Sequence, residues 1–171
     1  DIDDVCLENR FAKQIQIINE NPNIDILGGN IKCFETYPNF FPGRKVPMSL
    51  PQIHRYIKYR NPVNHPTVFF NKNKILELGG YPNARLGQDY LLWIKALNNG
   101  LKIQNTEEIL VYMKVDKKSH SRRGLTNFKY DSMPYLMMYR YNMTNIMNLL
   151  IGLFIRFIYC TYSSIKSVIK L

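Results

Sequence analysis

Residues 88–115 read QDYLLWIKALNNGLKIQNTEEILVYMKV. Large apolar side chains recur on one side of residues 88–99, which predicts a helix, and Gly100 is a suitable stop for it. Two short apolar runs follow at 101–104 and 109–115, and each predicts a β-strand. A chain in which helices alternate with strands is typical of an α/β domain, so we predict that class.

The chain before residue 88 continues this alternation. Apolar residues three or four positions apart predict an amphipathic helix over residues 7–20. Its apolar stripe consists of Leu7, Phe11, Ile15 and Ile18. The other expected elements are strands at 24–27, 30–34 and 67–70, helices at 52–60 and 72–78, and an irregular proline-rich loop at 36–51.

The last 26 residues, 146–171, predict an amphipathic helix with a wide apolar face. Arg156 and Lys166 interrupt the apolar run, which disfavours a helix that crosses a bilayer. We therefore expect this helix to lie in the plane of a membrane surface, with its basic groups toward the lipid headgroups. The alternative is that its apolar face packs on its own domain or on a partner subunit.

The net charge of +10 is concentrated in the last third of the chain. Residues 1–113 carry 13 basic and 11 acidic side chains, a balance of +2, whereas residues 114–171 carry 10 and 2, a balance of +8. Such a basic segment suits an anionic membrane or a nucleic acid. A nucleic-acid module would use Lys117, Lys118, Arg122, Arg123, Phe128 and Tyr130. No recognition motif accompanies these residues, so we expect no nucleic-acid partner.

The cysteines and the acidic start of the chain carry different information. Cys6, Cys33 and Cys160 match no metal-binding spacing, which favours a reducing compartment such as the cytoplasm.

Asp1-Ile2-Asp3-Asp4 places three carboxylates within four residues, and carboxylate oxygens are ligands that Mg²⁺ or Mn²⁺ prefers. Taken alone, such a triplet more often belongs to a solvated surface or a helix N-terminus than to a metal site.

Several stretches in this order and spacing resemble the family 2 glycosyltransferases, whose catalytic domain has the nucleotide-sugar-binding GT-A fold. The matching stretches are DIDD at 1–4 with ENRF at 8–11, NP at 21–22 leading to Gly28, HPTV at 65–68, GGY at 79–81, QDYLLW at 88–93 and GLKI at 100–103. The resemblance covers residues 1–121. It implies the C-terminal half of a GT-A mixed-sheet domain, followed by C-terminal helices.

The resemblance also implies roles for individual residues. Asp3 would bind Mg²⁺ or Mn²⁺ directly, and Asp1 would contact the ribose or the waters of the metal. Asp89 matches the family's general base, which takes the proton of an acceptor hydroxyl as that oxygen displaces the diphosphate with inversion. Without the resemblance, Asp89 would be read as a carboxylate stabilised by a helix N-terminus.

Other site residues leave alternatives open. His65 either contacts the sugar or the acceptor, or fixes the turn before Pro66. Trp93 either stacks on a sugar or belongs to the core, and Gln88 stands where the family usually has Glu, beside the proposed base. Arg10 is expected to have a structural role, orienting the acidic stretch through charge-assisted bonds.

The end of the last strand departs from the family pattern. Many members have Tyr-x-Arg-x-His there, with a His that completes the metal shell. In this chain Lys114 takes the place of the Arg, and Asp116 takes the place of the His. A carboxylate at Asp116 could still bind the ion, whereas His120 could replace it only if the loop bends back.

These observations predict three segments: a partial catalytic domain at 1–121, a basic linker or helix at 122–145 and a membrane-associated helix at 146–171. We expect the family's nucleotide-binding half to precede Asp1, so that residues 1–171 alone bind nucleotide sugar weakly or not at all. The expected activity moves a sugar from a nucleotide sugar, such as a UDP-sugar, to a saccharide or lipid-linked acceptor at the cytoplasmic face of a membrane. Alternatives are an inactive transferase-like domain and a glycoside hydrolase, although paired hydrolase carboxylates flank a bond rather than form a triplet.

Overall fold

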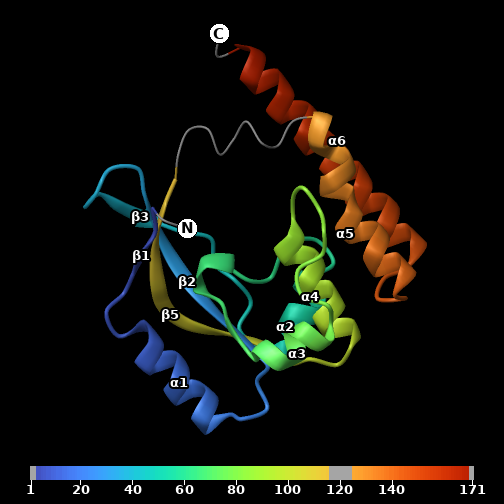
Figure 1. The fold of residues 1–171 in the computed structure, drawn as a ribbon. Helices are drawn as coiled ribbons and strands as arrows, with labels where there is room; N and C mark the ends of the chain where they lie inside the picture. The colour runs from blue at the N-terminus through green and yellow to red at the C-terminus, as the bar shows by residue number, and fades with distance from the viewer. Residues whose placement is uncertain (1–2, 116–124, 170–171) are drawn as a thin grey trace. The chain divides into compact units, whose positions relative to one another are not determined.

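The computed structural model describes residues 3–115 and 125–169, and the chain divides into two compact units. The first unit comprises Asp1–Gly80 with Lys95–Val115, and the second comprises Tyr81–Ile94 with Asp116–Leu171. Figure 1 labels the helices and strands of both units. The predicted α/β class with a mixed sheet is confirmed.

The first unit is built on a five-stranded sheet with the order β1-β5-β2-β3, in which β4 also pairs with β2. The strands are β1 (Val5–Cys6), β2 (Ile26–Phe34), β3 (Phe40–Pro42), β4 (Phe69–Phe70) and β5 (Ile103–Lys114). β2 and β5 are parallel and lie side by side in Figure 1, whereas every other pairing is antiparallel. Ile26, Leu27, Ile103 and Leu110 have no exposed surface, so these two strands form the centre of the core.

β5 is one strand of 12 residues, where the sequence predicted two short strands. The polar residues between the two apolar runs stay within the strand, where Glu107 and Glu108 are exposed and Asn105 is buried. The register with β2 shifts at this point, since Gly29 lies opposite Thr106 but Asn30 lies opposite Ile109. An irregularity of this kind absorbs extra residues without ending a strand, which explains the difference.

Part of the loop predicted at 36–51 is the edge strand β3. It pairs with the end of β2, with Phe34 opposite Phe40 and Lys32 opposite Pro42. Proline is tolerated on an edge strand, where it need not donate a hydrogen bond. The ring of Phe40 also packs on Tyr112 of β5, with the ring centroids 4.2 Å apart, so aromatic contacts favour this pairing.

The short helices of the first unit confirm most of the predicted ones, and two of them, α2 and α3, begin at capping residues. They are α1 (Arg10–Glu20), α2 (Leu50–Tyr56), α3 (Lys72–Glu77) and the 3-10 turn η1 (His65–Thr67). Gln52 Oε1 accepts the backbone N–H of Ser49 at 3.1 Å before α2, and Asn71 Oδ1 accepts that of Lys74 at 3.2 Å in α3. The predicted strand at 67–70 is shorter than expected, because η1 takes up its first residue.

The helix predicted at 7–20 is present as α1, but the prediction of its buried face was wrong. Phe11 and Ile15 of the apolar stripe are 55% and 48% exposed. Arg10 and Gln14 are buried instead, and Arg10 Nε donates to Gln14 Oε1 at 3.0 Å. Periodicity alone counts these residues as polar and therefore misses that hydrogen bonds pair them in the interior.

The second unit contains the first part of α4 (Gln88–Asn98), then η3 (Leu125–Asn127), α5 (Phe128–Arg140) and α6 (Ile146–Ile169). The predicted C-terminal helix is confirmed as α6. It packs on α5 at Gly152, where an added Cβ would lie 2.5 Å from Tyr135 Cδ1, so only glycine allows this approach. By length and composition alone, residues Ile146–Ile165 qualify as a membrane-spanning helix, and 17% of that segment is buried.

The prediction that Arg156 faces lipid headgroups was wrong. Arg156 is half-buried, and its guanidinium forms a hydrogen bond with the Tyr135 side chain of α5 near the Asp131 carboxylate. Cys160, one turn further along α6, is fully buried with its Sγ 3.5 Å from Asp131 Oδ2. Burial, followed by the charge of Asp131, raises the pKa of the Cys160 thiol to about 11, so the thiol stays protonated and donates this bond.

Candidate active site

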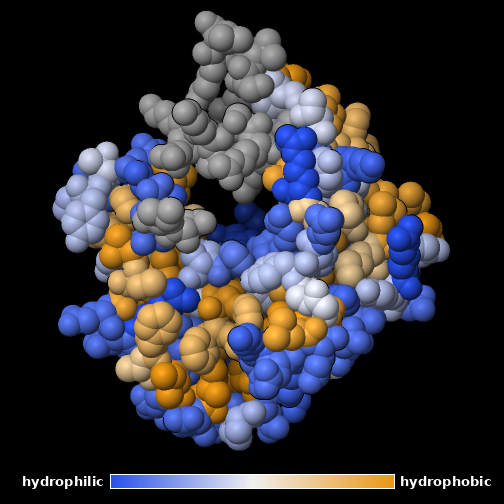
Figure 2. All heavy atoms as spheres, in the orientation of Figure 1, coloured by the Kyte–Doolittle hydropathy of each residue, from blue (hydrophilic) through white to orange (hydrophobic). Residues whose placement is uncertain are grey.

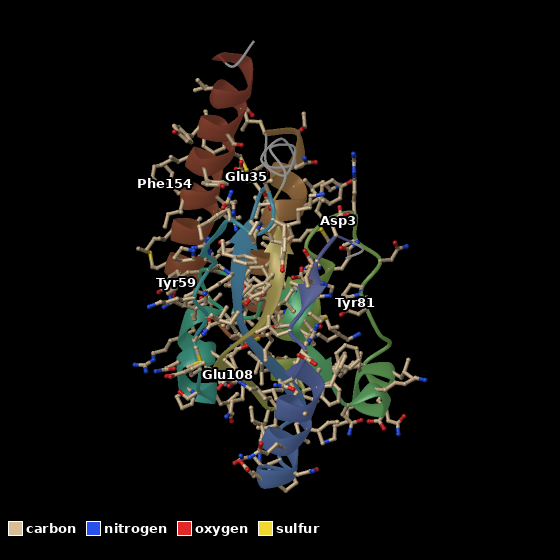
Figure 3. The ribbon with its side chains drawn as sticks, turned by 90° about the vertical axis from the view of Figure 1, so that its left-hand side faces the viewer. Asp3, Glu35, Tyr59, Tyr81, Glu108 and Phe154 are labelled. Carbon is tan, nitrogen blue, oxygen red and sulfur yellow. The ribbon has the colours of Figure 1, made fainter. Side chains whose placement is uncertain are left out.

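The acidic start of the chain lies beside the carboxyl end of β5. β1 runs antiparallel to β5 with Val5 opposite Tyr112, and the backbone N–H of Lys114 donates to Asp4 Oδ1 at 2.9 Å. Figure 3 shows the labelled Asp3 beside the start of β1. Because β2 and β5 are parallel, Asp3 and Asp4 lie near the carboxyl ends of both strands, the edge at which α/β sheets bind ligands.

The two described carboxylates of this stretch differ in environment. Asp3 is exposed, whereas Asp4 Oδ2 is buried and has no hydrogen-bond partner in the described parts of the chain. Cys33 of β2 is within electrostatic reach of Asp4. Burial, and then the Asp4 carboxylate, raises the pKa of the Cys33 thiol. A buried carboxylate oxygen without a donor is unfavourable unless a cation or another donor satisfies it.

These oxygens fit a hard divalent cation in chemical type. Mg²⁺ is commonly held by one or two carboxylates, with water and substrate phosphates completing its shell. Within residues 3–115 and 125–169, no group of three or more His, Cys, Asp or Glu side chains is arranged to hold a metal. The predicted ligands Asp1, Asp116 and His120 lie outside the described residues, so their predictions stay open.

The HPT stretch forms a turn that buried hydrogen bonds fix. Thr67 Oγ1 donates to the backbone oxygen of Asn64 at 2.7 Å and accepts the backbone N–H of Gly29 at 2.9 Å. Asn64 Nδ2 in turn donates to the backbone oxygen of Gly29 at 3.0 Å. Asn64 and Thr67 are 4% and 0% exposed, whereas His65, the first residue of the turn, has an exposed side chain. The bonds of Asn64 and Thr67 account for the turn and present His65 at the surface.

A second set of hydrogen bonds connects this turn with the acidic stretch. Gln14 Nε2 of α1 donates to the backbone oxygen of Thr67 at 2.9 Å, and Gln14 Oε1 accepts from Arg10. Arg10 Nη1 then donates to Cys6 Sγ of β1 at 3.1 Å. Arg10 therefore links α1 to the strand that follows Asp3 and Asp4, through a thiol rather than through a carboxylate.

The proposed base Asp89 is the second residue of α4 and is partly exposed, and Gln88 beside it is exposed. The pKa of Tyr81 is raised, first by burial and then by the Asp89 carboxylate, which means that the two side chains are within electrostatic reach. Tyr81 is not among the site residues predicted from the sequence. Gly79 and Gly80 precede it with φ values of 81° and 70°, so this GGY turn was the signal that could have found it.

Trp93 was predicted either to stack on a sugar or to belong to the core, and the structure supports the core. Its side chain is 0% exposed, together with Leu92 and Ile94 in the same helix. A ring without exposed surface cannot stack on a ligand, so we remove Trp93 from the candidate site. Of the remaining candidates, Asp3 and His65 belong to the first unit, and Gln88 and Asp89 belong to the second.

Sequence relatives of the chain are named glycosyltransferases. An uncharacterized glycosyltransferase of Haemophilus influenzae is 38% identical over 156 residues, which cover 90% of this chain and 57% of the relative. The UDP-Gal:alpha-D-GlcNAc-diphosphoundecaprenol beta-1,3-galactosyltransferase of Escherichia coli is 40% identical over 129 residues, which cover 72% of this chain and 45% of the relative. The chain thus spans about half the length of these two relatives, and no protein-family model matches it.

Among solved structures, the fold is similar to that of TarS 1–349 from S. aureus. The TM-score is 0.56 at 16% sequence identity, and the match covers 90% of this chain and 44% of TarS 1–349. At this identity the likeness concerns the fold alone. The chain therefore shares its α/β fold with TarS, and most of its length is homologous to proteins named as glycosyltransferases.

Proposed function

We propose that the chain is the acceptor-side part of the catalytic domain of a family 2 glycosyltransferase with a GT-A fold. The enzyme transfers a sugar with inversion from a nucleotide-diphosphate sugar to a hydroxyl of a saccharide or lipid-linked acceptor. The observation that carries this proposal is 38% and 40% identity to named glycosyltransferases over 90% and 72% of the chain. The name of the second relative contains a UDP-sugar donor and a diphosphoundecaprenol-linked acceptor, which supports the same classes here.

The proposed chemistry assigns the proton transfer to Asp89. Its partly exposed carboxylate at the start of α4 accepts the proton of the acceptor hydroxyl while that oxygen attacks the anomeric carbon. The bond between the anomeric carbon and the diphosphate oxygen breaks on the opposite side, and the electron pair leaves with the diphosphate. Gln88 and His65, both exposed, are the proposed contacts to the donor or the acceptor.

Asp3 and Asp1 are the proposed ligands for Mg²⁺ or Mn²⁺. When bound, such an ion acts as a Lewis acid that stabilises negative charge on a leaving diphosphate. The exposed Asp3 carboxylate and the unpartnered oxygen of Asp4 support an oxygen site at this position. Asp116 and His120 remain candidate ligands from the sequence. Lys114 holds Asp4 in place through its backbone N–H, which orients the acidic stretch.

We further propose that the protein works at the inner, cytoplasmic face of a membrane, as a peripheral protein. The apolar surface of α6 and the basic charge of residues 114–171 support this location. The lipid-linked acceptor in the name of the E. coli relative is also consistent with it. The wide separation of Cys6, Cys33 and Cys160 in the sequence favours a reducing compartment.

Transfer by the full-length protein tests the proposal. Nucleoside diphosphate release is measured with a panel of nucleotide sugars, with and without saccharide or lipid-linked acceptors, in Mn²⁺ and after chelation. We expect release to require an acceptor and a divalent ion, and Asp3→Asn to raise the Mn²⁺ concentration needed for half-maximal release. Glu77→Gln, an exposed carboxylate change on α3, is the control that should leave release unchanged. Undiminished turnover after chelation would remove the metal from the proposal, and a failure with every donor would favour an inactive domain.

A further inference from the structure

α6 exposes a long apolar surface to its surroundings. Eleven large apolar or aromatic side chains between Ile146 and Ile165 are 37% to 64% exposed, and Phe154 is the most exposed of them. Figure 2 shows groups of hydrophobic side chains among hydrophilic ones over the region of α5 and α6, and Figure 3 shows Phe154 pointing away from α5. These exposures correspond to an apolar area on the order of 1,000 Å², above the 300–600 Å² of the largest patch on a typical monomer.

Three polar side chains of α6, those of Arg156, Cys160 and Ser164, contact α5 and η3. The Arg156 guanidinium bonds to Tyr135, Cys160 bonds to Asp131, and Ser164 Oγ accepts the backbone N–H of Leu125 at 2.9 Å. A water-exposed helix normally has the reverse arrangement, with its polar side toward solvent. Packing against α5 therefore turns the apolar side of α6 outward along its length.

We propose that this apolar face of α6, the exposed side chains between Ile146 and Ile165, docks in the plane of an anionic lipid bilayer. The axis of α6 then lies parallel to the membrane, its apolar face enters the acyl region, and α5 stays on the headgroup side. This inference deepens the proposed function by naming the membrane-contacting surface, and it rests on that function only for the choice of a cytoplasmic membrane.

The charges support lipid as the occupant. Within Ile146–Ile165 the only charged residue is Arg156, and it is turned toward α5, so the face has no charge over about 30 Å of helix. The exposed basic side chains Lys129 and Arg140 belong to α5, the helix on which α6 packs. An uncharged apolar face on a helix whose neighbour carries exposed basic side chains is complementary to acyl chains beneath anionic headgroups.

The neighbouring helix α5 favours the in-plane orientation over a spanning one. α5 carries Lys129, Asp131 and Arg140, and the side chains of Lys129 and Arg140 are exposed. A spanning α6 would either carry these charges into the hydrocarbon or lose its bonds to α5, and both are unfavourable. An in-plane helix keeps α5 in contact with water while its own apolar side is covered.

The test measures binding of the full-length protein to vesicles, without nucleotide sugar or acceptor. The vesicles contain phosphatidylglycerol and phosphatidylethanolamine, and vesicles of phosphatidylcholine provide the comparison. We expect Phe154→Glu to reduce the partition onto anionic vesicles about 10-fold or more, because a charge replaces a Phe that enters the acyl region when the protein is bound. Leu76→Glu on α3, where the side chain is 59% exposed, is the matched control and should bind like the wild type.

A second variant separates the possible occupants and does not depend on the charge change being tolerated. Phe154→Trp adds one exposed indole to a chain whose single tryptophan, Trp93, is fully buried. We expect lipids brominated near the headgroup to quench the new fluorescence more strongly than lipids brominated at the chain end. Three results would each overturn the proposal. The first is stronger quenching by lipids brominated at the chain end, and the second is an indole that is already shielded before vesicles are added. The third is a dimer that Phe154→Glu dissociates without changing vesicle binding. If the wild-type protein binds the vesicles as expected but transfers no sugar in the assay of the proposed function, that result contradicts the proposed function and leaves the membrane proposal standing.

Discussion

Thr67→Val removes one hydroxyl from the interior of the first unit with almost no change in shape. That hydroxyl accepts the backbone N–H of Gly29 at 2.9 Å and donates to the backbone oxygen of Asn64 at 2.7 Å. Thr67 and Gly29 are both buried, so water cannot replace the lost partner. A buried donor left without an acceptor costs about 1–3 kcal/mol, and we expect the free energy of unfolding to fall by about 2 kcal/mol.

Urea unfolding of the full-length protein, followed by circular dichroism, measures this loss. Thr67→Ser is the control, because it keeps the hydroxyl and removes only a methyl group, which costs about 1 kcal/mol. Hydrogen exchange of the Gly29 amide gives an independent readout and should be faster in Thr67→Val than in Thr67→Ser. A Val variant that is as stable as the Ser variant, with unchanged exchange at Gly29, would refute the assignment of this hydrogen bond.

Two further predictions concern Gly29 and Tyr81. Gly29→Ala should lower the free energy of unfolding by about 1–3 kcal/mol, because the added Cβ would lie 2.6 Å from Cδ1 of the fully buried Leu110. Calorimetry measures this loss, and wild-type stability would contradict the packing of Gly29 on Leu110. Asp89→Asn should lower the raised pKa of Tyr81 without restoring its usual value, because burial is the larger cause; NMR titration of labelled tyrosine measures it, with Tyr81→Phe for assignment. Neutral Tyr81 stabilises the fold below the usual tyrosine pKa, and this contribution is lost as the pH rises through the raised pKa. An unchanged Tyr81 pKa in Asp89→Asn would contradict the electrostatic interaction between the two side chains.

The α/β class and most helices could be predicted from the sequence because local patterns determine them. The helix at 88–99 and the C-terminal helix have strong apolar patterns, and the structure has them at Gln88–Asn98 and Ile146–Ile169. β3 was missed because Phe40–Pro42 becomes a strand only through its pairing with β2. The length of β5 was missed for a similar reason, since its polar middle is held by a shifted register with β2.

The orientation of two helices could not be predicted from periodicity. In α1 the stripe with Phe11 and Ile15 is exposed, and Arg10 and Gln14 are buried because each finds hydrogen-bond partners inside. In α6 the polar side with Arg156 packs on α5. A hydrophobic pattern shows that a helix has two different faces, but buried polar partners decide which face is inside.

The candidate site was predictable to different extents. The acidic motif around Asp3 could be recognised in the sequence. Its place at the carboxyl edge of β2 and β5 comes from the structure, in which the backbone N–H of Lys114 donates to the neighbouring Asp4. Tyr81 was missed because its significance depends on its closeness to Asp89, which sequence spacing does not show. Trp93 was placed among candidate ligands from its position one turn after Asp89, but it belongs to the core.

The central proposal, sugar transfer with Asp89 as the general base, is tested most directly by the turnover number of Asp89→Asn in the full-length protein. The measurement uses saturating nucleotide sugar, acceptor and divalent ion, with Glu77→Gln as the control. We predict that kcat falls about 10²- to 10⁴-fold, because loss of general base catalysis has that magnitude, while donor binding is retained. A variant that transfers sugar at the wild-type rate would contradict the assignment of Asp89 and the mechanism built on it.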